Sequence, residues 1–153
     1  MKLLKQQRPT CLLYSAAMAL DVDPAAISAY LGRDGSELRS SGPVGVHMQE
    51  IMDYALSIGS LFYLVLPAPV QKYTDGTTRQ VFPHQGKRFA SHVLGKQGLL
   101  IGRYRDGEDH AVAFKGLKIY DPNGAKYGMS SGKFMIEEAW ICVCLHRPAS
   151  TEG

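Results

Sequence analysis

Apolar residues at helical spacing dominate the first 60 positions of the chain. After Thr10, a residue type that caps helix N-termini, apolar residues recur at intervals of three and four as far as residue 20. Asp23 followed by Pro24 is a typical start for a second, short helix, which Gly32 ends, and Gly59 is a natural stop for a third. The pattern predicts helices over residues 11–20, 24–31 and 46–58, with a loop at 33–45 that is rich in Gly, Ser and Pro.

After residue 60 the period of the apolar pattern changes to two, which indicates strands. A poorly patterned, proline-containing segment at 67–90 interrupts the series. Helices followed by antiparallel strands predict an α+β fold in one domain, residues 1–147, with a frayed tail at 148–153. The predicted strands are 60–66, 79–82, 99–104, 110–114, 117–121, 133–136 and 140–145, and a short helix is expected at 87–94.

Composition narrows the class of protein without changing this picture. The 153 residues are 45% hydrophobic and 20% charged, which is typical of a folded globular domain. The net charge is +3 and the basic residues are scattered, so we expect no nucleic-acid partner. The N-terminus lacks the apolar run of a secretory signal, and no stretch reaches the roughly 20 apolar residues of a membrane span. With three cysteines, an odd number, we expect a cytoplasmic protein without a disulfide framework.

Two of the predicted strands bring a histidine and an aspartate together. If Lys115-Gly116 is a two-residue hairpin turn, Phe114 pairs with Leu117. Continuing that ladder outward places His110 directly opposite Asp121 on the same face of the sheet. Opposed side chains have Cβ atoms roughly 4.5–5.5 Å apart, close enough for a carboxylate to hold one imidazole nitrogen protonated. The other nitrogen could then act as a base.

Cys11 is the group that such a pair could activate. It falls in the first turn of its predicted helix, where backbone N–H groups and the helix dipole favour a thiolate. Gln6, with the backbone N–H of Cys11, could stabilise an oxyanion, and Gln7 is the alternative donor. The predicted catalytic residues are therefore Cys11, His110, Asp121 and Gln6.

The order of these residues resembles the papain-like cysteine peptidases. Gln6 and Cys11 lead into a helix of small residues. Much later, one strand begins at His110 and another ends at Asp121-Pro122. This arrangement is most similar to that of the double-glycine leader peptidases. These are the peptidase domains of bacteriocin exporters and their stand-alone relatives. Leu12 replaces the small residue that often follows the nucleophile, and the Gln6–Cys11 distance is short for the family. The resemblance implies a papain-like fold, a peptide or isopeptide substrate and no cofactor.

Other interpretations remain open. Residues 33–98 match no known motif, and we expect them to shape the substrate cleft. The same triad could serve amidase or transglutaminase-type acyl transfer. These residues could also belong to a papain-like binding module that does not cleave, or to an interaction protein of unrelated fold. His47 could replace His110 as the base, but it has no acidic partner in register. The alternating Cys142, Cys144 and His146 are interpreted as strand packing and not as a metal site.

Overall fold

The computed structural model describes residues 1–7, 10–36, 38–39, 42–43, 45–65, 70–72, 76, 78–80 and 87–145. The expected tail at 148–153 and His146 lie outside the described residues. The helices are α1 (Cys11–Leu20), α2 (Pro24–Leu31), α3 (Met48–Ser57) and α4 (Lys87–Val93), and Met129–Ser131 form a 3-10 turn, η1. The strands are β1 (Leu38–Arg39), β2 (Gly42–Pro43), β3 (Ser60–Val65), β4 (Val70–Lys72), β5 (Thr78–Gln80), β6 (Gln97–Tyr104), β7 (Asp109–Lys115), β8 (Lys118–Tyr120), β9 (Lys126–Gly128) and β10 (Phe134–Cys144).

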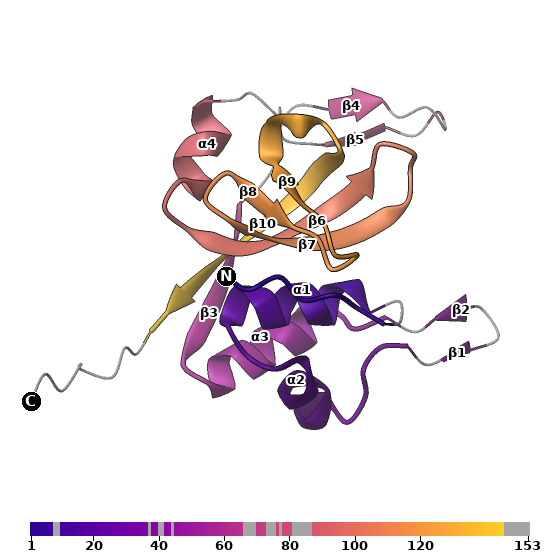
Figure 1. Cartoon of the computed structure of the whole chain (residues 1–153), viewed down its shortest axis with the longest axis vertical. Coiled ribbons are helices and arrows are strands. Elements are labelled where there is room, and N and C mark those ends of the chain that lie inside the picture. The colour runs from indigo at the N-terminus through magenta and orange to yellow at the C-terminus, as the bar shows by residue number, and fades with distance from the viewer. Residues whose placement is uncertain are drawn as a thin grey trace, which may run out of the picture.

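A six-stranded antiparallel sheet organises the molecule, with strand order β3-β10-β6-β7-β8-β9. Helices α1, α2 and α3 lie together on one side of this sheet, and α4 lies on the other side (Figure 1). The short strands β1 and β2 pair with each other, as do β4 and β5. The expected α+β class, with N-terminal helices packed on an antiparallel sheet, agrees with this arrangement.

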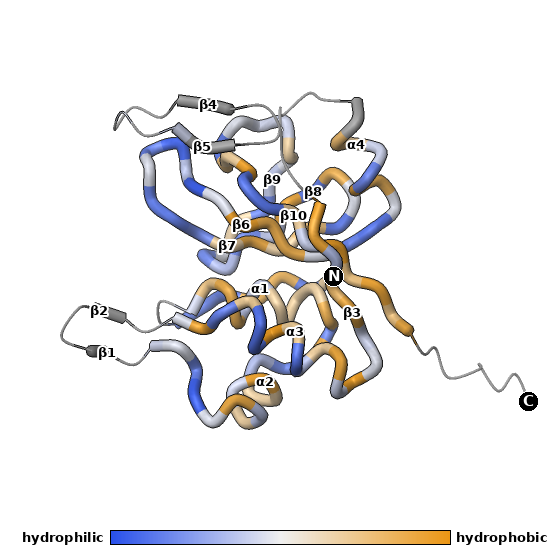
Figure 2. Tube along the Cα trace, turned by 180° about the vertical axis from the view of Figure 1, so that it is seen from behind, coloured by the Kyte–Doolittle hydropathy of each residue, from blue (hydrophilic) through white to orange (hydrophobic). Residues whose placement is uncertain are grey.

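Alternation of side chains along the strands gives the sheet a buried core on each face. Leu99 and Phe62 belong to the core shared with α1, α2 and α3. Leu100, the next residue of β6, belongs to the core on the opposite face, together with Phe89 and Val93 of α4. Figure 2 shows hydrophobic residues along α1 and the central strands and hydrophilic residues at the turn between β6 and β7. The central strands carry long apolar runs because both faces of the sheet are covered.

Small side chains let α1 approach β7 closely. Ala111 and Ala113 of β7 are buried, as are Ser15 and Ala16 of α1, which packs against this strand. The buried hydroxyl of Ser15 donates a hydrogen bond of 3.0 Å to the carbonyl oxygen of Ala111. This bond fixes the first turns of α1 beside the start of β7, the two places where the sequence predicts catalytic groups.

Several local predictions are confirmed. Helix α2 spans the expected residues, and the Asp23 side chain accepts a hydrogen bond of 2.9 Å from the backbone N–H of Ala25. Helix α1 begins after Thr10 as expected, although the Thr10 side chain makes no capping hydrogen bond. The third helix, by contrast, is shorter than the predicted 46–58: α3 begins at Met48, with His47 as its N-cap residue, whose backbone N–H donates to the Glu50 side chain over 2.8 Å.

Several predictions about the strands are wrong. The segments predicted separately at 133–136 and 140–145 form the single strand β10. Its register with β6 shifts between Ile136 and Glu138, so a bulge carries the chain past the polar residues that suggested a break. The predicted loop at 33–45 contains the short strands β1 and β2. Strands β4 and β9 are also absent from the prediction, because two or three residues give too short a pattern to recognise from periodicity.

Candidate active site

The turn between β7 and β8 differs from the predicted one by a single residue. Lys115 pairs with Lys118, so the two turn residues are Gly116 and Leu117. Gly116 occupies the first turn position with φ 59°, and a hairpin turn of type II′ takes glycine there. The sequence-based assignment placed the glycine second, and the predicted pairing of Phe114 with Leu117 is therefore wrong.

The correction shifts the ladder by two residues and leaves the face unchanged. The observed pairs Phe114–Ile119 and Ala113–Tyr120 carry Asp121 to a position opposite Val112, and not opposite His110. A shift by an even number keeps side chains on the same side of a strand, whereas a shift by one would have separated them. The two side chains therefore meet diagonally: His110 Nε2 lies 2.8 Å from Asp121 Oδ1.

The Asp121 carboxylate has no exposed surface. Besides His110, it accepts hydrogen bonds from the hydroxyls of Tyr104 and Tyr127, each at 2.7 Å to Oδ2, and from the backbone N–H of Asn123 at 3.0 Å to Oδ1. Burial acts to raise the pKa of Asp121, but these four donors outweigh it and hold the pKa below its usual value. Because an ionised carboxylate only accepts, His110 Nε2 is the donor in its bond to Asp121.

Cys11 is the first residue of α1, as the sequence predicts, and its side chain hydrogen-bonds to His110. Burial acts to raise the pKa of the Cys11 thiol, yet the hydrogen bond and charge of His110, with the backbone N–H groups of Ala111 and Leu12, bring it below its ordinary value of 9.0. The His110 side chain is 8% exposed. Burial alone would lower the pKa of His110, but its bonds to Asp121 and Cys11 raise it to about 9. The arrangement favours a thiolate beside an imidazolium.

Aromatic rings pack around the histidine. The ring of Tyr104 stacks on His110 with centroids 4.5 Å apart and an angle of 24° between the planes. Phe134 meets His110 edge-on, with centroids 6.4 Å apart. These contacts restrict the imidazole to one orientation. Sequence reasoning did not identify Tyr104, Tyr127 or Phe134, because each comes from a different strand or turn than His110 and Asp121.

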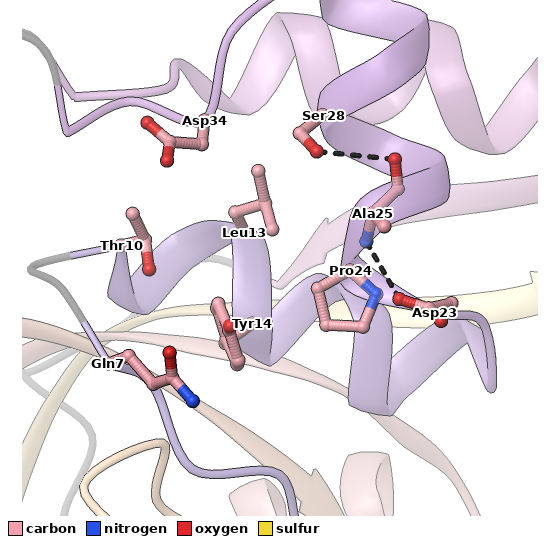
Figure 3. Close-up of a pocket in the computed structure, with 9 residues that line it drawn as sticks. All are labelled: Gln7, Thr10, Leu13, Tyr14, Asp23, Pro24, Ala25, Ser28 and Asp34. Carbon is pink, nitrogen blue, oxygen red and sulfur yellow. Dashed lines mark hydrogen bonds between the residues drawn. The ribbon is translucent and has the colours of Figure 1, made fainter.

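The two candidate oxyanion donors lie in different surroundings. The backbone N–H of Gln6 donates to the carbonyl oxygen of Pro122 over 2.7 Å, beside Asp121, and the Gln6 side-chain oxygen accepts from the backbone N–H of Thr10 over 3.1 Å. These two bonds hold Gln6 next to the start of α1. The side chain of Gln7, by contrast, is exposed and lines a cavity of about 420 Å³ between the start of α1 and α2 (Figure 3).

The remaining candidates do not join this cluster. His47 is exposed at the start of α3. Cys142 packs partly buried against the core beside the helices, and Cys144 is exposed. In the described part of the chain, no group of three or more His, Cys, Asp or Glu side chains is placed to hold a metal ion. Among the described helices, none is long and apolar enough to cross a membrane alone.

Comparison with known proteins gives no family assignment for this arrangement of residues. No protein-family model matches the sequence, and no curated protein matches it either.

Proposed function

We propose that the chain is a papain-like cysteine hydrolase that cleaves a peptide or isopeptide bond through Cys11, His110 and Asp121. The observation that carries the proposal is the geometry around His110. Its Nε2 is hydrogen-bonded to the buried Asp121 carboxylate, and its side chain is also hydrogen-bonded to that of Cys11 at the start of α1. A thiol, an imidazole and a carboxylate linked in this order are the parts needed to activate a sulfur nucleophile.

In the proposed reaction the Cys11 thiolate attacks the carbonyl carbon of the substrate. The developing oxyanion receives hydrogen bonds from Gln6 and the Cys11 backbone N–H. As the C–N bond breaks, His110 gives its proton to the leaving amine, and the acyl group remains on Cys11 as a thioester. His110 then takes a proton from water, whose oxygen attacks the thioester, and the acid product leaves as the thiolate reforms.

Three further observations support this assignment. Cys11 forms no disulfide, as a nucleophilic thiol requires, and a reducing compartment such as the cytoplasm would keep it in that state. The order Gln6, Cys11, His110 and Asp121 along the chain is that of papain-like peptidases. The reaction needs no metal or cofactor, because all of its proton transfers are assigned to side chains of the site.

Alkylation of Cys11 by iodoacetamide across pH tests the nucleophile. Peptide mass spectrometry reads each cysteine separately, so the exposed Cys144 is an internal reference. We expect Cys11 to react faster than Cys144 at pH 5–6, where a free thiol with its usual pKa of about 8.5 is almost fully protonated. The His110→Ala variant should lose this advantage. Equal, alkaline-only rates for both cysteines in the parent protein would refute the proposal.

A peptide digest in H₂¹⁸O tests the reaction outcome and separates a hydrolase from the alternatives. Hydrolysis places one ¹⁸O in each new carboxyl terminus, and transfer to an amine places none. New termini should be absent with Cys11→Ala and present with Cys144→Ala, the matched control. A reactive Cys11 that produces no new termini and no amine adducts would instead indicate a binding module.

A further inference from the structure

Two tyrosine hydroxyls converge on one oxygen of Asp121. Tyr104 reaches Asp121 Oδ2 from β6 and Tyr127 reaches it from β9, and both distances are 2.7 Å. The carboxylate has no solvent contact, so water cannot supply these donors. A buried carboxylate remains charged only when donors replace the water it has lost.

The direction of the Tyr104 bond is fixed by a neighbouring amide. Asn123 Nδ2 donates to the Tyr104 hydroxyl oxygen over 3.1 Å, and Asn123 Oδ1 is itself held by the backbone N–H of Ala125 at 3.0 Å. With its oxygen occupied as an acceptor, the Tyr104 hydroxyl hydrogen is directed to Asp121. The same tyrosine stacks its ring on His110, so one side chain contacts both members of the pair.

We infer that Tyr104 and Tyr127 are positioning residues of the site, whose hydroxyls hold the Asp121 carboxylate ionised and oriented so that His110 keeps its proton beside Cys11. The inference rests on the proposed function, because it assigns a role within that triad. The tyrosines act through Asp121 and do not themselves touch the reacting atoms.

The charges around the pair determine the sign of the effect. His110, Tyr104 and Tyr127 face Asp121, Cys11 faces His110 from α1, and Glu108 acts on Tyr104 from the turn before β7. Burial and the Asp121 charge raise the pKa of both tyrosine hydroxyls, so they remain neutral donors over the working range. Without them, Asp121 would take up a proton at a higher pH, and His110 would lose the charge that keeps it protonated.

The test measures the pH dependence of Cys11 alkylation in Tyr104→Phe, Tyr127→Phe and the double variant. Tyr120→Phe is the matched control, since Tyr120 lies on β8 with its ring under Lys126. We expect the acid limb of the Cys11 rate to move to higher pH by about one unit or more in the double variant. Each single variant should move it less, and the control should leave it in place.

Each outcome is decisive. An acid limb at the parent position in the double variant would overturn the inference, as would a lower rate at every pH with an unchanged midpoint, which indicates packing alone. If the double variant fails to fold, the single variants decide by the same criterion. The proposed function fails separately, when the parent Cys11 itself shows no reactivity at low pH.

Discussion

Replacing Asp121 by asparagine should destabilise the protein in a way that depends on pH. The substitution keeps the shape of the side chain and removes the buried charge that His110 contacts at 2.8 Å. The pKa of His110 is raised from 6.5 to about 9. This difference corresponds to about 3 kcal/mol of stability, of which Asp121 contributes one part and Cys11 another.

A second cost comes from the donors that Asp121 now receives. The amide group of an asparagine would bring two N–H donors toward the hydroxyls of Tyr104 and Tyr127, which donate to Oδ2 in the parent. An unsatisfied buried polar group costs about 1–3 kcal/mol. We therefore expect Asp121→Asn to lower the free energy of unfolding by about 2–4 kcal/mol at pH 6.

The sign of the pH dependence follows from the direction of each shift. The pKa of His110 is raised, so its contribution is complete below pH 6.5 and disappears as the pH rises through about 9. The pKa of Asp121 is lowered, so its contribution is present above pH 3.8 and disappears as the pH falls through the lower folded value. The difference between parent and variant should be largest between these limits and shrink from pH 6.5 to 9.

Urea unfolding followed by the fluorescence of Trp140, the one tryptophan of the chain, measures this difference. Asp53→Asn is the matched control, because Asp53 is an exposed residue of α3. Substitutions at such surface positions change stability by about 0.5 kcal/mol or less, so the control should stay close to the parent. An Asp121→Asn variant as stable as the parent at pH 6, or a difference that grows toward pH 9, would refute the reasoning.

Three further predictions concern Gln6, Gly98 and Cys142. Gln6→Ala should lower the turnover number by about 100-fold or more if Gln6 stabilises the oxyanion, while Gln7→Ala should change it little; equal effects in steady-state assays would reject that assignment. Gly98→Ala places a Cβ against the Trp140 carbonyl oxygen of β10 and should lower the free energy of unfolding, measured in urea, by about 1–3 kcal/mol. Gly45→Ala, whose Cβ would meet nothing within 4 Å, should leave it unchanged, and equal effects of the two variants would contradict this. Burial and the nearby Cys144 raise the pKa of Cys142 to about 11, so mass spectrometry should find Cys142 alkylated only at alkaline pH, and labelling of it at pH 6 would contradict this.

The helices and the identity of the candidate residues could be predicted because their signals are local. The cap at Asp23 and the spacing of apolar residues in α1 act within a few positions of the chain. The position of Cys11 at the start of a helix follows from the same local rules. For His110 and Asp121 the prediction gave the correct face of the sheet from an incorrect turn, because the error of two residues preserves the alternation of side chains.

Only the tertiary structure determined what surrounds that pair. The turn type decides the register of β7 and β8, and it depends on the positive φ of Gly116. The residues next to Gly116 do not specify this turn type. Tyr104 and Tyr127 reach Asp121 from β6 and β9, which lie on either side of β7 and β8 in the sheet order β6-β7-β8-β9. These strands follow one another along the chain, but the register of each pair, and so the side chains that meet, depends on turn geometry that the alternation of apolar residues does not reveal. The sequence by itself therefore determined which candidate groups lie on the same face, and the sheet determined how their charges are held.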